Sequence, residues 1–94
     1  MIQVTMVAAN TYQVAVDGRE REPSLHLVSL TQEYYRHLSG GTVTHEWVIV
    51  QAFQFLLERM PNTEIREAVD LAEVAEHFDD FESEVARRLG RQIG

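Results

Sequence analysis

The chain has 94 residues, a formal net charge of −7 and no cysteine. A chain of this length forms one domain with a modest core, and without cysteine it has no disulfide, thiolate zinc site or cysteine nucleophile. The acidic balance argues against nucleic acid as a partner, because phosphate binding needs a basic face. It argues equally against an anionic membrane surface.

The first thirty residues have the pattern of β-strands. Apolar and polar side chains alternate over residues 2–8 and again over 11–17, which indicates two half-buried strands with a tight turn between them. Residues 17–24 contain Asp-Gly and a proline and are expected to form a loop. Residues 25–30 form a third short strand. We therefore expect an antiparallel sheet of two or three strands.

A short helix follows the strands. Thr31 is a suitable N-cap for a helix that begins at Gln32 and ends at His37 or Leu38. The glycines that come next are typical of a helix end, where a left-handed conformation is common.

The most apolar part of the chain predicts a long central helix over residues 45–60. Thr44 is its N-cap, and Pro61 stops it. Its apolar sector covers more than half of the circumference at 100° per residue, so we expect this helix to be packed on two sides. Trp47 is the exception, because it falls on the polar side together with Gln51.

Shorter helices are expected after the proline. One runs from Asn62 or Thr63 through Val69. The apolar face then changes register, and Asp70 begins a capping box that starts another helix. A further break is expected near Asp79, which would cap the last helix.

Together these patterns predict an α+β fold, with the N-terminal sheet followed by four or five helices around the central one. The chain is expected to be a single domain over residues 1–94, β-rich over 1–30 and helical over 31–94. It has no apolar run long enough to span a membrane and no signal-peptide pattern at its start. We therefore expect a cytoplasmic location.

Two stretches of the sequence resemble a family of small bacterial proteins of similar length. They are "LTQEYYRHLSGGTVTHEWVIVQAFQFLLERMPNTEI", residues 30–65, and "VDLAEVAEHFDDFESEV", residues 69–85. The most specific part is the F-x-F-L-L-E-R-x-P segment. The sequence departs from the family pattern at Asp79, where the family has proline, and at Met60, where an acid is usual. The family has no assigned activity, so the resemblance implies an architecture and no catalytic residues.

The four histidines do not form a recognisable metal or catalytic motif. They are His26, His37, His45 and His77. His45 and Glu46 begin like the zinc motif H-E-x-x-H, but Ile49 stands where the second ligand belongs. We expect surface histidines near helix ends, no metal, no cofactor and no enzymatic activity. The alternative is a small-molecule or metal-dependent enzyme that uses His37, His45 and Glu46 beside the Gly-Gly turn.

Binding another protein, including a second copy as a homodimer, is the function that the sequence favours. The candidate contact residues are Trp47, Tyr34, Tyr35, Glu73, Glu76, Asp80 and Glu84. Trp47 is either covered by the sheet or the Gly-Gly turn, or it is an exposed anchor, because Trp and Tyr are enriched in interfaces. The four acids have the spacing of one helix face, which is either solvated or a patch for a basic partner. An acidic mimic of nucleic acid is the remaining alternative.

Overall fold

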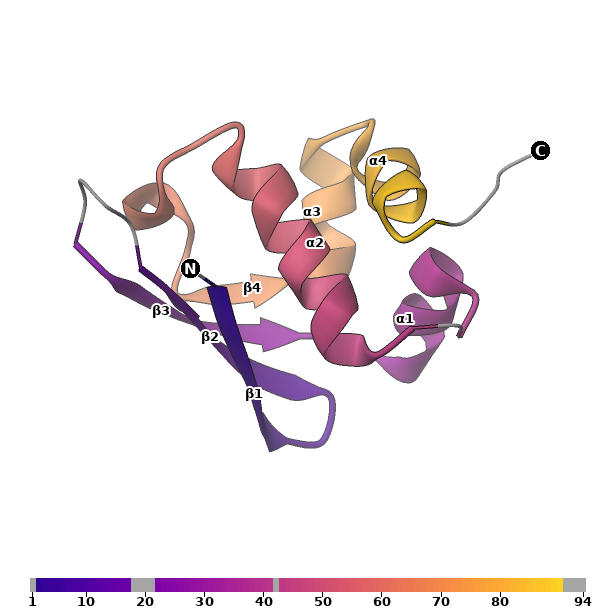
Figure 1. Cartoon of the computed structure of the whole chain (residues 1–94), viewed down its shortest axis with the longest axis horizontal. Coiled ribbons are helices and arrows are strands. Elements are labelled where there is room, and N and C mark those ends of the chain that lie inside the picture. Colours follow the sequence, from indigo (N-terminus) through magenta and orange to yellow (C-terminus); the bar gives the residue numbers. More distant parts are fainter. Residues whose placement is uncertain (1, 18–21, 42, 91–94) are drawn as a thin grey trace.

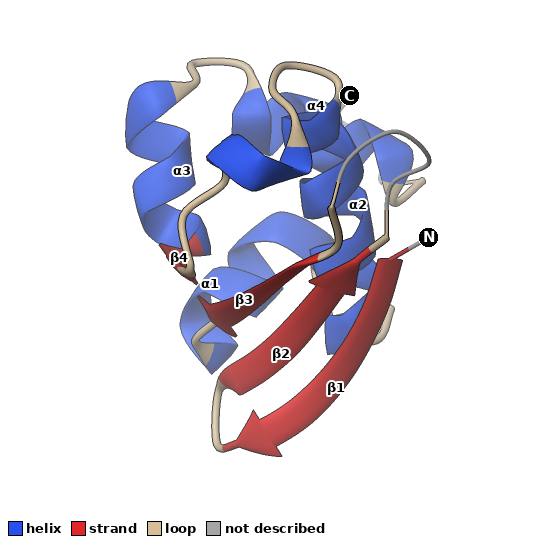
Figure 2. Cartoon of the chain, turned by 90° about the vertical axis from the view of Figure 1, so that its left-hand side faces the viewer, coloured by secondary structure: helices blue, strands red, loops and turns tan. Residues whose placement is uncertain are grey.

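The computed structural model describes residues 2–17, 22–41 and 43–90, which form a mixed four-stranded sheet with helices packed against one face (Figure 1, Figure 2). The α+β class is confirmed. In chain order the described elements are β1 (Ile2–Ala8), β2 (Thr11–Val16), β3 (Ser24–Ser29), α1 (Gln32–Ser39), α2 (His45–Leu57), the 3-10 helix η1 (Asn62–Glu64), β4 (Ala68–Asp70), α3 (Leu71–His77) and α4 (Phe81–Arg88).

The sheet has the order β1-β2-β3-β4. The first three strands form the predicted antiparallel meander, but β4 pairs in parallel with β3, where Val28 is opposite Val69. The helix predicted over residues 62–69 is therefore wrong, and η1 and β4 occupy that segment. Ile65 and Val69 fit one helix face by spacing, yet a β-branched residue such as Val69 is equally suited to a buried strand position.

The helices bury the inner face of the sheet. On β2 this face carries Tyr12, Val14 and Val16, which are 0–4 % exposed, and on β3 it carries Val28. The outer face has no helix over it in Figure 2, and Leu27 on that face is 50 % exposed. The core is therefore a single layer between the sheet and the helices.

Side-chain caps begin α1 and α2 as predicted. The Thr31 hydroxyl accepts from the Tyr34 amide at 3.1 Å, and the Thr44 hydroxyl accepts from the Trp47 amide at 3.1 Å. Gly40 ends α1 with φ of +70°, a left-handed conformation that favours glycine.

The central helix α2 ends at Leu57, three residues before the predicted end. The Arg59 amide donates to the Leu56 carbonyl at 2.9 Å, so the last turn is tightened before Pro61 makes further helix unfavourable. The expected packing on two sides is present, because α2 contacts β1 on one side and α1 and α4 on the other.

Gln51 was expected to face solvent, but it is only 7 % exposed. It lies one turn before Phe55, whose ring packs against Phe81 of α4 with centroids 5.2 Å apart. The helices α1 and α4 cover this side of α2, which a helical wheel of α2 alone does not reveal.

The breaks predicted in the C-terminal part are confirmed. Asp70 caps α3 by accepting from the Ala72 amide at 3.0 Å. The expected cap at Asp79 is wrong by one residue, since Asp80 is the N-cap of α4 and makes no side-chain capping bond. Phe81, the first residue of α4, is fully buried. None of the described helices has the length and apolar content needed to cross a lipid bilayer.

Candidate functional site

His26 belongs to a buried polar network and is not the surface histidine that the sequence predicted. Its side chain is on the inner face of β3 and only 2 % exposed. Nδ1 donates to the Arg66 carbonyl at 2.6 Å, since a carbonyl only accepts, and Nε2 lies 2.8 Å from the Ser24 hydroxyl. Asn62 donates to the same hydroxyl at 2.9 Å and to the Glu22 carbonyl at 2.9 Å.

The network has the Ser–His contact of a nucleophile and its base, but its surroundings make it structural. Asn62 donates to one lone pair of the Ser24 hydroxyl oxygen and thereby holds this hydroxyl between η1 and His26. Both Asn62 and His26 are almost fully buried, at 3 % and 2 % exposure. Through these hydrogen bonds the network connects β3 to η1, at Asn62, and to the segment before β4, at Arg66.

The two histidines of the proposed enzyme region, His37 and His45, have separate partners. His37 pairs with Glu82 at 3.3 Å, whereas the ring of His45 stacks on Tyr35 with centroids 3.7 Å apart. The described residues contain no group of three His, Asp or Glu side chains placed to hold a metal ion.

The hydroxyl groups of the two candidate tyrosines bond within the molecule. Tyr35 is 8 % exposed, and its hydroxyl donates to the Val43 carbonyl, so it is a core residue. Tyr34 is partly buried and donates to Glu82 at 2.8 Å. Burial and the bond to Glu82 raise the pKa of Tyr34 well above its usual value, and the same bond lowers the pKa of Glu82.

The four candidate acids do not line one helix face. Glu73 and Glu76 are on α3, but the helix break places Asp80 at the start of α4 and Glu84 within it. Asp80 pairs with Arg59 at 2.6 Å.

The remaining acid of this set also has a basic partner. Glu84 pairs with Arg87 at 2.7 Å, and this bond lowers the pKa of the Glu84 carboxyl. Arg88 bridges to Glu58 of α2 at 2.6 Å. Part of the negative charge is therefore neutralised on the surface of α4, which leaves no uniform acidic face.

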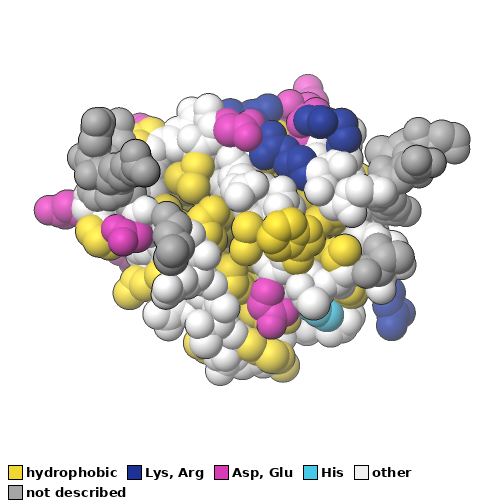
Figure 3. Space-filling view, in the orientation of Figure 1, with side chains coloured by type: hydrophobic (Ala, Val, Ile, Leu, Met, Phe, Trp, Pro, Cys, Tyr) yellow, Lys and Arg dark blue, Asp and Glu magenta, His cyan; other side chains and the backbone are white. Residues whose placement is uncertain are grey.

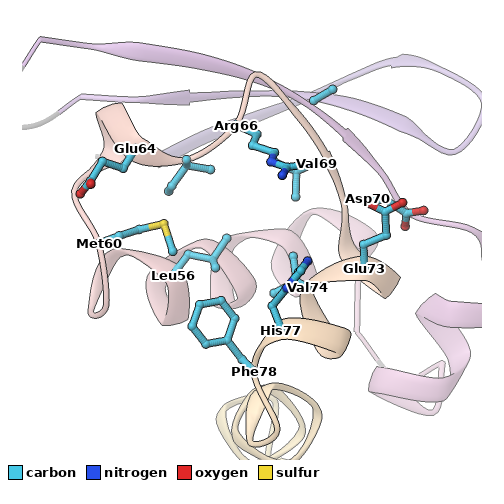
Figure 4. A pocket seen from close by; sticks show the side chains of 12 residues that line it. Leu56, Met60, Glu64, Arg66, Val69, Asp70, Glu73, Val74, His77 and Phe78 are labelled. Carbon is cyan, nitrogen blue, oxygen red and sulfur yellow. The ribbon is translucent and has the colours of Figure 1, made fainter.

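A pocket of about 290 Å³ lies between β4, α3 and the end of α2 (Figure 4). Leu56, Val74 and Phe78 point toward one another across it, with Arg66 and Glu73 at its rim. Its volume is at the lower limit for small-molecule sites, and such sites also need placed polar groups. The charged rim residues are exposed, so the pocket defines no particular ligand.

Trp47 is 47 % exposed, so the expectation that the sheet or the Gly-Gly turn covers it is wrong. On the same side of α2, at helical spacing, lie Val50, Gln54 and Leu57; Val50 and Leu57 are partly exposed. We call these four residues the α2 stripe. Figure 3 shows hydrophobic side chains gathered across the middle of this face, with arginines and acids above them.

The α2 stripe adjoins the edge strand β1, which sequence reasoning did not single out. Strand β1 contacts α2, and both lie at the front of the molecule (Figure 1). Met6 and Val7 of β1 are 58 % and 49 % exposed. The signal in the sequence was the composition of residues 2–8, which have no charge, proline or glycine.

Together the α2 stripe and β1 form an apolar surface that includes the single tryptophan of the chain. Such a surface can contact a second macromolecule. Comparisons of this chain with protein-family models, with curated proteins and with solved structures found no match.

Proposed function

We propose that this protein acts by binding another protein through the α2 stripe and the adjoining strand β1. The observation that carries the proposal is the exposure of Trp47, at 47 % of its surface, on the outer side of the central helix. Leaving so much of an indole in water forfeits free energy that a partner can recover by covering it.

The energetics of interfaces support this role for Trp47. Tryptophan is among the residues most enriched in interface hot spots, where truncation to alanine costs about 2 kcal/mol or more. Val50 and Leu57 extend the apolar contact along the helix, and Gln54 between them can form hydrogen bonds. Glu58 at the end of the stripe is already paired with Arg88, which gives the patch a polar rim of the kind that surrounds protein interfaces.

The position of the surface also supports binding. The helix α2 forms the centre of the core, with Ile49 and Phe53 fully buried. A contact surface on such a rigid element loses little conformational entropy when a partner binds.

A capture experiment that compares two alanine variants, Trp47→Ala and Leu27→Ala, tests the proposal. Tagged protein is used to capture partners from cells of its own source, including untagged copies of the same chain. Trp47→Ala is expected to lose the captured protein, because it removes the anchor. Leu27→Ala is the control, since Leu27 is similarly exposed, at 50 %, but on the outer face of the sheet.

Both variants should keep the melting temperature of the wild type within a few degrees, because each alters an exposed side chain. If Trp47→Ala captures the same proteins in the same amounts as the wild type, the α2 stripe is not the binding surface and the proposal is wrong.

A further inference from the structure

We infer that the protein on this surface is a second copy of the chain, joined by antiparallel pairing of the two β1 strands around a two-fold axis at Val4. This inference rests on the proposed function and names its partner. It follows from three features of the structure: the direction of the free backbone groups of β1, the absence of charge on that strand, and the position of α2 beside it.

The hydrogen-bonding pattern of the sheet shows which backbone groups of β1 face outward. The Leu30 amide donates to the Asn10 carbonyl at 2.9 Å, so the even-numbered residues of β2 direct their N–H and C=O groups toward β3. The odd-numbered ones therefore bond to β1, where Gln13 is opposite Thr5 and Ala15 is opposite Gln3.

The alternate residues of β1 consequently present their N–H and C=O groups to the free edge. They are Ile2, Val4 and Met6. No strand pairs with this edge within the described part of the chain. A row of free groups like this one is a template for pairing with another strand.

Strand β1 lacks the devices that protect edge strands. Natural edges are commonly made short, charged or bulged, or contain proline. The other edge of the sheet follows that rule, since β4 has three residues and includes Asp70. By contrast, β1 has seven residues without a charge, and its irregularity lies after Met6, between Met6 and Ala8. Residues 2–6 therefore form a regular, uncharged edge.

The strand is complementary to itself. With a two-fold axis at Val4, antiparallel pairing places Val4 opposite Val4 of the second copy and Met6 opposite its Ile2. Each of these narrow pairs forms two main-chain hydrogen bonds, about six in total. A chain with net charge −7 repels its own copy except where a neutral surface meets a neutral surface, and β1 supplies such a surface.

The helix α2 adds apolar contact beside the paired β1 strands. Because α2 packs against β1, joining the two β1 strands at the usual spacing of about 4.8 Å brings the two α2 stripes together on the helix side of the sheet. Trp47 is then covered by the partner, and the two four-stranded sheets become one continuous sheet. Symmetric contacts of this kind are the commonest form of soluble oligomer.

Sedimentation across a dilution series from about 300 to 1 µM tests the inference with the full chain. The wild type is expected to change from twice the chain mass of 10.8 kDa to the single mass. The fluorescence of Trp47, the single tryptophan, should shift to longer wavelength over the same range. Met6→Pro should raise the dissociation constant at least tenfold, because it removes an outward N–H without removing a bond to β2.

Amide hydrogen exchange gives a readout that does not depend on any variant. The Val4 and Met6 amides should become protected as the concentration rises, whereas the Gln3 and Thr5 amides, which face β2, should be protected throughout. Leu27→Lys is the matched control on the outer face of the sheet and should leave the dimer intact.

The outcomes separate this inference from the proposed function. A wild type that stays monomeric at every concentration overturns the inference, while the proposed function survives if Trp47→Ala still loses a captured protein. A dimer that Leu27→Lys dissociates, or one that leaves the Val4 and Met6 amides unprotected, also overturns it, because the copies then meet elsewhere.

Discussion

Replacing Ser24 with alanine tests the buried network around His26 most directly. The Ser24 hydroxyl accepts from Asn62 and donates to Nε2 of His26, at 2.9 and 2.8 Å. Because Nδ1 of His26 donates to the Arg66 carbonyl, Nε2 is the acceptor in the Nδ1-protonated tautomer, and the Ser24 hydroxyl is the donor that the structure places beside it. Removing the hydroxyl leaves a buried acceptor unsatisfied, while Asn62 keeps its bond to Glu22.

An unsatisfied buried polar group costs about 1–3 kcal/mol. The unfolding entropy of a chain of this length is about 0.2 kcal/mol per kelvin, so the melting temperature of Ser24→Ala should fall by about 5–15 °C. Calorimetry or circular dichroism at pH 7 measures the change. Ser29→Ala is the matched control, since Ser29 is on the same strand but exposed, and it should shift the melting temperature by no more than about 2 °C.

Nitrogen-15 NMR of the His26 ring supplies an independent check, because the Nδ1-protonated tautomer is expected. A Ser24→Ala variant that melts within 2 °C of the wild type, or a wild-type ring protonated only at Nε2, would refute the assignment of the network.

Three further predictions concern the core, one helix end and one side-chain hydrogen bond. Phe53→Ala removes a fully buried ring and should lower the free energy of unfolding by about 3–5 kcal/mol in denaturant titrations; a loss below 1 kcal/mol would mean that α2 is not the central helix. Gly40→Ala places a side chain at φ of +70° and should cost about 1 kcal/mol in the same titration, and no change would contradict the left-handed end of α1. Tyr34→Phe removes the donor that lowers the pKa of Glu82. A carboxyl whose pKa is lowered in the folded state stabilises the fold at pH values above its ordinary pKa of 4.5, and this contribution is lost as the pH falls through the pKa of the folded state. The variant should therefore be less stable than the wild type at pH 7, and the difference in stability should shrink below about pH 4. A stability difference that stays constant from pH 7 to pH 3 would contradict this prediction.

Local signals in the sequence were sufficient for most of the elements. The alternation over β1 and β2 and the N-caps at Thr31, Thr44 and Asp70 depend on neighbouring residues alone, and the structure has each of them. Elements that depend on distant partners were missed. Strand β4 has only three residues, and it is a strand because β3 lies beside it.

The candidate site shows the same division. The exposure of Trp47 depends on what α2 packs against, and its position on the polar side of the helix was readable from the sequence. The burial of His26 was not, because its partner, Arg66, is contributed by another segment of the chain. The importance of β1 was likewise hidden, since only the strand order shows that it is an edge.

The parallel pairing of β3 with β4 has a consequence for folding during synthesis, because the two strands are far apart in the sequence. Strand β3 is complete at residue 29, but its second neighbour begins only at residue 68. At ordinary elongation rates of about 5–20 residues per second, β4 begins to be synthesised about 2–8 s after β3 is complete. During this interval both edges of the nascent sheet lack a neighbouring strand, and unpaired strand edges are prone to aggregation.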